Sequence, residues 1–333
     1  MQTPYSTGLR ERAMYSDAQT HASDTKDLVT TPRVLRKTLA VLILLGLVMV
    51  AYLLWARPYQ LVWGATTEEI HRRMPGDELS LRPTFLATRA ITIEGTPDVI
   101  WPWLVQMGYG RAGFYGYDIL ENLGSARGIR SAHRILPELQ QVAVGDFLPL
   151  SAAGGLVFQA IAPPRYLVWA GASGAFPGGF TWALYPVDAS HTRLVSRIQW
   201  SHHCANPLVL ALDVFTEFTD HIAVRKILHG VKDRVEGHFE PMAEQNGEFA
   251  VYVWAFVDLL AAVGLILLRP LTWRLWLAGL GTGVAWLIVW YAPITMGIGV
   301  AVNLLVLWVL RWAEVNPDTR APSAHHITGR ESP

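Results

Sequence analysis

Long apolar runs lie toward both ends of the chain, and a patterned region lies between them. Thr38–Ala56 holds 19 residues without a charge, Phe249–Leu268 holds 20 residues with one charge, and Leu275–Leu310 runs 36 residues without a charge. About 20 helical residues span the ~30 Å hydrocarbon core of a bilayer. A helix would end just before Pro293, so the third run predicts two spans. The predicted membrane helices are 36–56, 249–268, 273–291 and 294–311.

Basic residues flanking these runs predict an orientation. Arg36 and Lys37 precede the first run, Arg269 and Arg274 lie between the second and third spans, and Arg311 follows the fourth. Cytoplasmic loops carry such an excess, so both termini should be cytoplasmic and residues 57–248 should lie on the outer face of a bacterial cell membrane. A single span plus a re-entrant piece in 275–310 would move the C-terminus to the other side. A buried core helix or a cleaved signal peptide is the alternative for the first run.

Asp258 interrupts the second run. A carboxylate inside a membrane is costly and hints at function. The alternative is that Asp258 faces a helix bundle and pairs with a polar group such as Asn303.

The sequence outside the apolar runs predicts two tails and a linker. Residues 1–35 and 313–333 are polar and predict disordered tails. Residues 57–84 predict a juxtamembrane linker.

The pattern of hydrophobic and polar residues in 85–240 predicts both strands and helices, as in an α+β domain. A half-buried strand is indicated at Thr88–Glu94, a helix at Val99–Met107 opened by Thr96 and Pro97, and a short helix at Tyr117–Leu123. Short runs separated by turn residues then predict an antiparallel meander. These strands are Asp146–Leu150, Leu156–Ile161, Tyr166–Ala170, Phe180–Tyr185 and Thr192–Trp200. In the last strand, Arg193 and Arg197 should lie on the solvated face.

One long helix, or two consecutive helices, should close the domain at Asn206–Glu240. An asparagine followed by a proline is typical of a helix start. Apolar residues then recur at steps of three and four and make one stripe. The stripe comprises Leu208, Ala211, Leu212, Phe215, Phe218 and Ile222.

Composition narrows the classes of function. Lys+Arg and Asp+Glu are equal at 27, and residues 57–248 carry a net charge of −3, so a nucleic-acid binder is not expected. Only 16% of residues are charged and 51% are hydrophobic, which excludes a disordered chain. The single cysteine, Cys204, excludes a disulfide scaffold and a Cys-rich zinc site. No cofactor is expected.

Three segments carry a resemblance to a known family. They are WPWLVQMGYGRAGFYGYDILENL (101–123), SAHRILPELQQVAVGDFLPL (131–150) and RKILHGVKDRVEG (225–237). Together with the order of elements, they resemble the START-like, or SRPBCC, superfamily of polyketide cyclases and lipid-transfer domains. The resemblance covers 85–240 and implies a helix-grip fold, in which a curved antiparallel sheet and a long C-terminal helix hold a hydrophobic ligand.

Candidate site residues follow from this expected cavity, which would be apolar with a few polar groups. Gln106 and Arg111 are the candidate polar anchors for a ligand head group. Aromatic residues of the 110–118 loop either line the cavity mouth or pack the junction of sheet and helix. The other candidates for the ligand contact are Trp103, Met107, Phe114, Tyr115, Tyr117, Trp182, Trp200 and Phe218.

Catalytic and metal chemistry have weaker signals. Asp118, Glu121 and His133 are candidates for acid–base work, although capping or pairing with an arginine is the simpler role for the acids. His202, His203 and Cys204 are metal-ligand types, but adjacent residues point to opposite sides and no metal motif occurs, so no metal is expected. The sequence therefore predicts a membrane-anchored domain that binds a lipid or hydrophobic small molecule. The alternatives are a polyketide cyclase-like or hydrolase-like enzyme, and a ligand-sensing or partner-anchoring membrane module.

Overall fold

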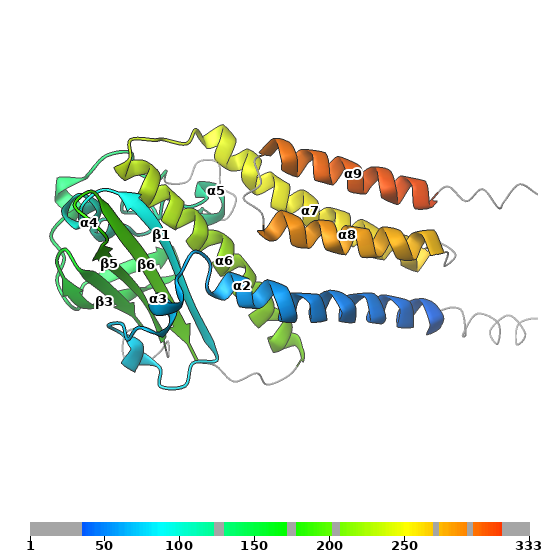
Figure 1. Ribbon diagram of the computed structural model, residues 1–333, viewed down its shortest axis with the longest axis horizontal. Coiled ribbons are helices and arrows are strands. Elements are labelled where there is room, and N and C mark those ends of the chain that lie inside the picture. Colours follow the sequence, from blue (N-terminus) through cyan, green and yellow to red (C-terminus); the bar gives the residue numbers. More distant parts are fainter. Residues whose placement is uncertain are drawn as a thin grey trace, which may run out of the picture. The chain divides into compact units, whose positions relative to one another are not determined.

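Six antiparallel strands form one open sheet, ordered β1-β6-β5-β4-β3-β2 (Figure 1). The computed structural model describes residues 35–122, 130–171, 178–201, 207–268, 273–291 and 296–314. The strands are β1 (Phe85–Glu94), β2 (Phe147–Ser151), β3 (Gly154–Ala162), β4 (Tyr166–Ala170), β5 (Gly178–Pro186) and β6 (His191–Trp200). The α+β class and the antiparallel meander are confirmed. The predicted tails, together with His202, His203 and Cys204, lie outside the described residues.

Helices connect and cover this sheet. In chain order they are η1 (Tyr52–Ala56), α2 (Arg57–Leu61), α3 (Thr67–His71), η2 (Asp77–Leu79), α4 (Pro97–Val105), α5 (Asp118–Glu121), η3 (Pro137–Leu139) and α6 (Pro207–Val235). The second predicted helix is a single turn, α5. The long helix ends five residues before the predicted Glu240, because Gly237 adopts a left-handed φ of 76° that terminates a helix.

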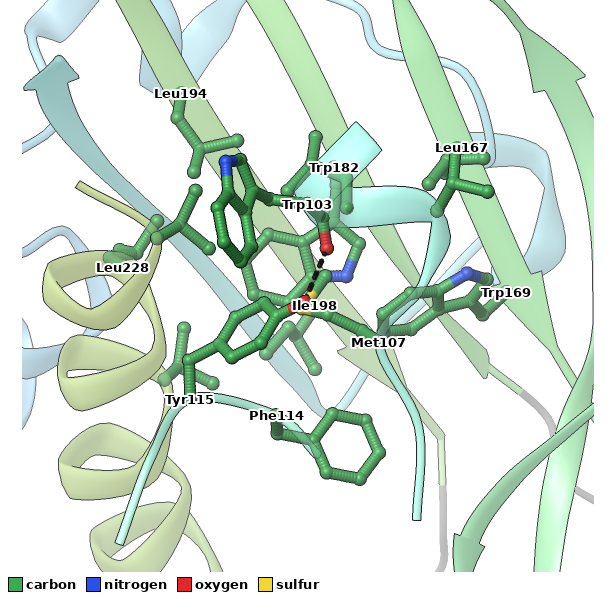
Figure 2. Packing of buried hydrophobic residues seen from close by; sticks show 14 of the residues in the cluster. Trp103, Met107, Phe114, Tyr115, Leu167, Trp169, Trp182, Leu194, Ile198 and Leu228 are labelled. Carbon is green, nitrogen blue, oxygen red and sulfur yellow. Dashed lines mark hydrogen bonds between the residues drawn. The ribbon is translucent and has the colours of Figure 1, made fainter. Parts of the chain in front are cut away.

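The inner face of the sheet packs against α4 and α6. Register places Phe85 of β1 beside Trp200 of β6, and the two rings stack with centroids 3.8 Å apart. Trp169 of β4, Trp182 of β5 and Leu228 of α6 belong to the same apolar core (Figure 2). Burial of these large side chains supplies most of the driving force for folding.

The outer face of the sheet is covered as well, which corrects the expectation that Arg193 and Arg197 lie on a solvated face. Residues 57–84 form short helices, and Met74 packs on the apolar side chains of the outer face. Arg197 is therefore buried rather than solvated. Its guanidinium donates to the carbonyls of Glu69 at 2.8 Å and Arg72 at 2.8 Å, and it pairs with Asp77 at 3.0 Å. The alternation of polar and apolar residues assigned Arg197 to the correct face of β6, but it did not reveal the segment that covers this face.

Arg193, expected on the same solvated face, pairs with Glu69 of α3 at 2.8 Å. Thr66 and Glu69 form a capping box, in which each side chain accepts a hydrogen bond from the other residue's backbone N–H. This box starts α3 and holds the Glu69 carboxylate toward Arg193. Residues 66–79 therefore bind to the sheet through arginines that the sequence pattern assigned to solvent.

Apolar helices before Tyr52 and after Ala250 form a second unit. Two helices are long and apolar enough to cross a membrane: Leu35–Leu61, whose last part is η1 and α2, and Met242–Leu268 (α7). Two more, α8 (Trp273–Tyr291) and α9 (Met296–Glu314), contain 19 residues each, and the apolar part of α9, Gly297–Ala313, is shorter. Ala262, Ala278 and Val306 pack α7, α8 and α9 together.

Candidate functional site

A cavity of about 890 Å³ lies between the inner face of the sheet and α6. Pockets for small molecules typically have volumes of roughly 300–1,000 Å³. The cavity is open to solvent and its surface is mostly apolar. Its described lining comprises Leu120, Leu150, Gly155, Leu156, Phe180, Trp200, Asp213, Phe215, Thr216, Thr219, Asp220 and Ala223.

The two walls of this cavity differ in chemistry. Leu150, Leu156, Phe180 and Trp200 come from four strands or strand ends and make the sheet wall apolar. The α6 wall carries polar residues at steps of three and four, which share one face of a helix. An amphiphilic molecule would therefore place its apolar part on the sheet and its polar groups on the helix.

Asp220 is the most deeply buried charged group of the helix wall. Its carboxylate pairs with Arg89 of β1, with 2.7 Å between Oδ2 and Nη1. Arg89 is fully buried and also donates through Nε to the carbonyl of Gln60. Burial raises the pKa of Asp220, and the guanidinium of Arg89 opposes this shift by favouring the ionised form. The pair ties the edge strand β1 to the helix at the cavity wall.

The two predicted polar anchors are engaged elsewhere. Gln106 donates from Nε2 to the hydroxyl of Tyr115 at 2.9 Å and accepts through Oε1 from the N–H of Leu136. Arg111 donates to the carbonyls of Met107 at 3.0 Å and Val105 at 3.1 Å. These bonds connect α4 with the segments that follow it. Neither side chain belongs to the described cavity lining.

The other predicted ligand contacts divide between the core and the cavity. Five of them belong to the buried cluster: Trp103, Met107, Phe114, Tyr115 and Trp182. In this cluster the hydroxyl of Tyr115 donates to the carbonyl of Trp103 at 3.0 Å (Figure 2).

Three further candidates remain, of which Trp200 also belongs to this cluster. Tyr117 packs on Phe249 with centroids 5.5 Å apart, and Phe218 of α6 is half-buried. Trp200 is the member of the predicted ligand set that belongs to the described cavity lining.

The 110–118 loop is held by a close approach to α6. Tyr115 has a φ of 65°, which is rare for a residue with a side chain. A Cβ at Gly230 would lie 2.1 Å from the carbonyl oxygen of Tyr115, so only glycine fits at this point of the helix. The guanidinium of Arg234 stacks on the Tyr115 ring, 4.3 Å from its centroid. These contacts are packing contacts at the junction of sheet and helix.

Two of the three candidate catalytic residues line the same pocket. Asp118 and His133 line a second pocket of about 410 Å³ beside the C-terminal part of α6, whereas Glu121 does not belong to its described lining. Asp118 accepts hydrogen bonds from the backbone and hydroxyl of Ser131. Glu121 accepts from the N–H groups of Phe114 and Gly116 at 3.1 Å each, and burial raises its pKa to about 7. Both carboxylates thus hold loop backbone.

Within the part of the chain that the structure describes, no three His, Cys, Asp or Glu side chains lie together in a group that could hold a metal ion.

Sequence reasoning missed Thr219 and Asp220, which line the cavity, and Arg89, which pairs with Asp220. A signal existed for two of them, because an arginine in an alternating strand and an aspartate beside an apolar helix stripe need partners when they are buried.

The fold and cavity define an α+β protein with an open antiparallel sheet, a long helix across its inner face and an apolar cavity between them. No protein-family model matches the chain, and no curated protein matches it. Similar solved structures include a conserved protein of unknown function from Enterococcus faecalis, with 14% identity over 53% of this chain and 93% of that chain and a TM-score of 0.23. Another is a polyketide cyclase-like protein from Corynebacterium glutamicum, with 12% identity over 45% of this chain and 91% of that chain and a TM-score of 0.24.

Proposed function

We propose that this chain is a membrane-anchored START-like domain of the SRPBCC type, which binds a lipid or hydrophobic small molecule between its sheet and α6 without catalysing a reaction. The observation that carries the proposal is the open, mostly apolar cavity of about 890 Å³. The segments of sequence that resemble this superfamily support the same assignment.

The walls of the cavity supply the binding energy. Each Å² of apolar surface removed from water contributes roughly 25 cal/mol. A ligand that buries about 300 Å² would gain roughly 7 kcal/mol, before the entropy cost of association is subtracted. Polar residues on α6 would set the orientation of the ligand, and Trp200 offers a flat aromatic surface on the opposite wall.

The apolar helices serve as the anchor in this proposal. All four described apolar helices cross the bacterial cell membrane, both termini are cytoplasmic, and the sheet domain faces outward. The basic residues beside the apolar runs support this orientation. Tethering raises the local concentration of a ligand that comes from the same membrane.

Filling the cavity tests the function directly. Ala223 lines the cavity on α6, so Ala223→Trp places an indole inside it. Ala189 lies exposed in the turn between β5 and β6, so Ala189→Trp is the same chemical change outside the cavity. The full-length proteins are purified in mild detergent, and bound molecules are extracted and quantified by mass spectrometry.

Wild type and Ala189→Trp should carry one hydrophobic molecule at close to one equivalent per chain, and Ala223→Trp should have lost it. A wild-type protein without a stoichiometric ligand would overturn the proposal. The same ligand at the same occupancy in Ala223→Trp would also contradict it.

A further inference from the structure

Asp258 of α7 is a buried carboxylate that forms no ion pair with any residue in the described part of the chain. The residue is 2% exposed, and neither carboxylate oxygen accepts a hydrogen bond within the described structure. The expected pairing with Asn303 is not made. An ionised carboxylate in apolar surroundings is strongly destabilising unless a positive charge or hydrogen-bond donors compensate it. Something must therefore neutralise Asp258.

Three helices bring polar side chains to the same place. Asp258 of α7, Thr282 of α8 and Asn303 of α9 line one cavity of about 10 Å³, and the rest of its lining is alanine and valine. This volume is about what a single water molecule or a single unhydrated ion requires. Each of the three helices supplies one of these polar residues, so the polar cluster depends on how α7, α8 and α9 pack together.

The hydroxyl hydrogen of Thr282 and one of the two amide hydrogens of Asn303 are engaged elsewhere. The hydroxyl of Thr282 donates to the carbonyl of Ala278 at 2.8 Å, and the amide nitrogen of Asn303 donates to the carbonyl of Gly299 at 2.9 Å. Thr282 therefore has only oxygen lone pairs to offer, and Asn303 keeps its amide oxygen. Oxygen ligands of this kind, with one carboxylate among them, suit a hard cation.

We propose that Asp258, Thr282 and Asn303 bind one monovalent metal cation of about the size of Na⁺. One carboxylate balances one positive charge, whereas divalent sites use more carboxylates or more room for water. The cavity is too small for an organic cation or a lipid head group. A bound ion would join α7, α8 and α9 at one point, so it should stabilise the helical unit. This site is independent of the ligand cavity in the sheet domain.

The test uses the full-length protein in detergent, with Na⁺ as the probe. Thermal unfolding is followed while NaCl replaces choline chloride at constant ionic strength, and binding of ²²Na⁺ is measured directly. We expect a saturable rise of the melting temperature and saturable ²²Na⁺ binding in the wild type. Asp258→Asn should abolish both, and Thr282→Val should weaken the affinity for Na⁺. Glu244→Gln is the matched control, because this exposed acid lies on the same helix, and it should behave as the wild type does.

Two results would overturn the proposal. One is a wild type that neither binds ²²Na⁺ nor responds to NaCl, in which case a proton neutralises Asp258. The other is an Na⁺ response that Asp258→Asn leaves unchanged. If Asp258→Asn does not fold, direct ²²Na⁺ binding to the wild type and to Thr282→Val decides between the same alternatives. Loss of the lipid ligand in Ala223→Trp has no bearing on this result, so the two proposals fail separately.

Discussion

Arg89 of β1 and Asp220 of α6 form an ion pair across the sheet–helix junction, with 2.7 Å between Nη1 and Oδ2. The side chain of Arg89 is 1% exposed and that of Asp220 is 10% exposed. Both charges are thus largely removed from water, so each depends on the other for compensation. Asp220 lines the cavity, so the pair also links the stability of the domain to the shape of the cavity.

Removing one partner should cost more than removing both. Asp220→Ala leaves the guanidinium buried and unpaired, and should lower the free energy of unfolding by about 3–5 kcal/mol. The double variant Arg89→Met with Asp220→Leu replaces the pair by apolar groups, and should lie within about 1–2 kcal/mol of the wild type. Urea unfolding followed by tryptophan fluorescence measures both. Equal losses in the single and double variants would show that the charges do not depend on each other.

Arg197 should hold residues 66–79 against the outer face of the sheet. Arg197→Lys keeps the charge but cannot reproduce the donors to the carbonyls of Glu69 and Arg72. We expect a loss of about 2–4 kcal/mol in unfolding free energy. Amide hydrogen exchange should become faster in residues 66–79 and stay unchanged in β4.

The control is Arg165→Lys, since Arg165 is exposed in the turn between β3 and β4. It should change neither the unfolding free energy nor the exchange rates by a measurable amount. Unchanged protection of residues 66–79 in Arg197→Lys would mean that Met74 and the apolar contacts alone hold this segment.

Strand positions were predictable from the sequence, but the surroundings of the strands were not. The alternation of side chains along a strand shows only which face each side chain occupies. The pattern around Arg197 is therefore the same whether that face is exposed to solvent or covered by another segment. The carbonyls that bind Arg197 belong to residues about 125 positions earlier, and no local pattern reports them.

The cavity could not be predicted from local sequence patterns for a similar reason. It is the space left between side chains of several strands and α6, and its volume depends on their packing rather than on any motif. The resemblance indicated where such a cavity should lie. It pointed to Gln106 and Arg111, whose polar groups the fold uses to secure the chain after α4.

Glu121 should make the protein less stable as the pH rises. Burial raises its pKa to about 7 from an ordinary value near 4.5. For an acid whose pKa is raised by folding, stability is full below the unfolded pKa and is lost as pH rises toward the folded pKa. The loss should reach about 2–3 kcal/mol between pH 5 and pH 8. Glu121→Gln should remove this decline, which urea unfolding across that range would show.

The matched control for Glu121 is Glu138→Gln, because Glu138 is exposed in η3. It should leave the pH dependence of the wild type intact. A Glu121→Gln variant with the wild-type pH profile would show that the carboxyl group ionises normally despite its burial.

His221 of α6 should have the opposite effect in part of the same pH range. Burial, together with the positive charges of Arg89 and Arg225, lowers its pKa to about 2. For a base whose pKa is depressed by folding, stability is present above the unfolded pKa near 6.5 and is lost as pH falls below it. Between pH 7 and pH 5 this loss should be about 2 kcal/mol, which offsets much of the gain from Glu121. His221→Gln should therefore be more stable at pH 5 than at pH 7, whereas Glu121→Gln should show the reverse. His238→Gln alters an exposed histidine and should follow the wild type. If His221→Gln follows it too, the imidazole takes up its proton in the folded protein and the neutral form is not the one that α6 buries.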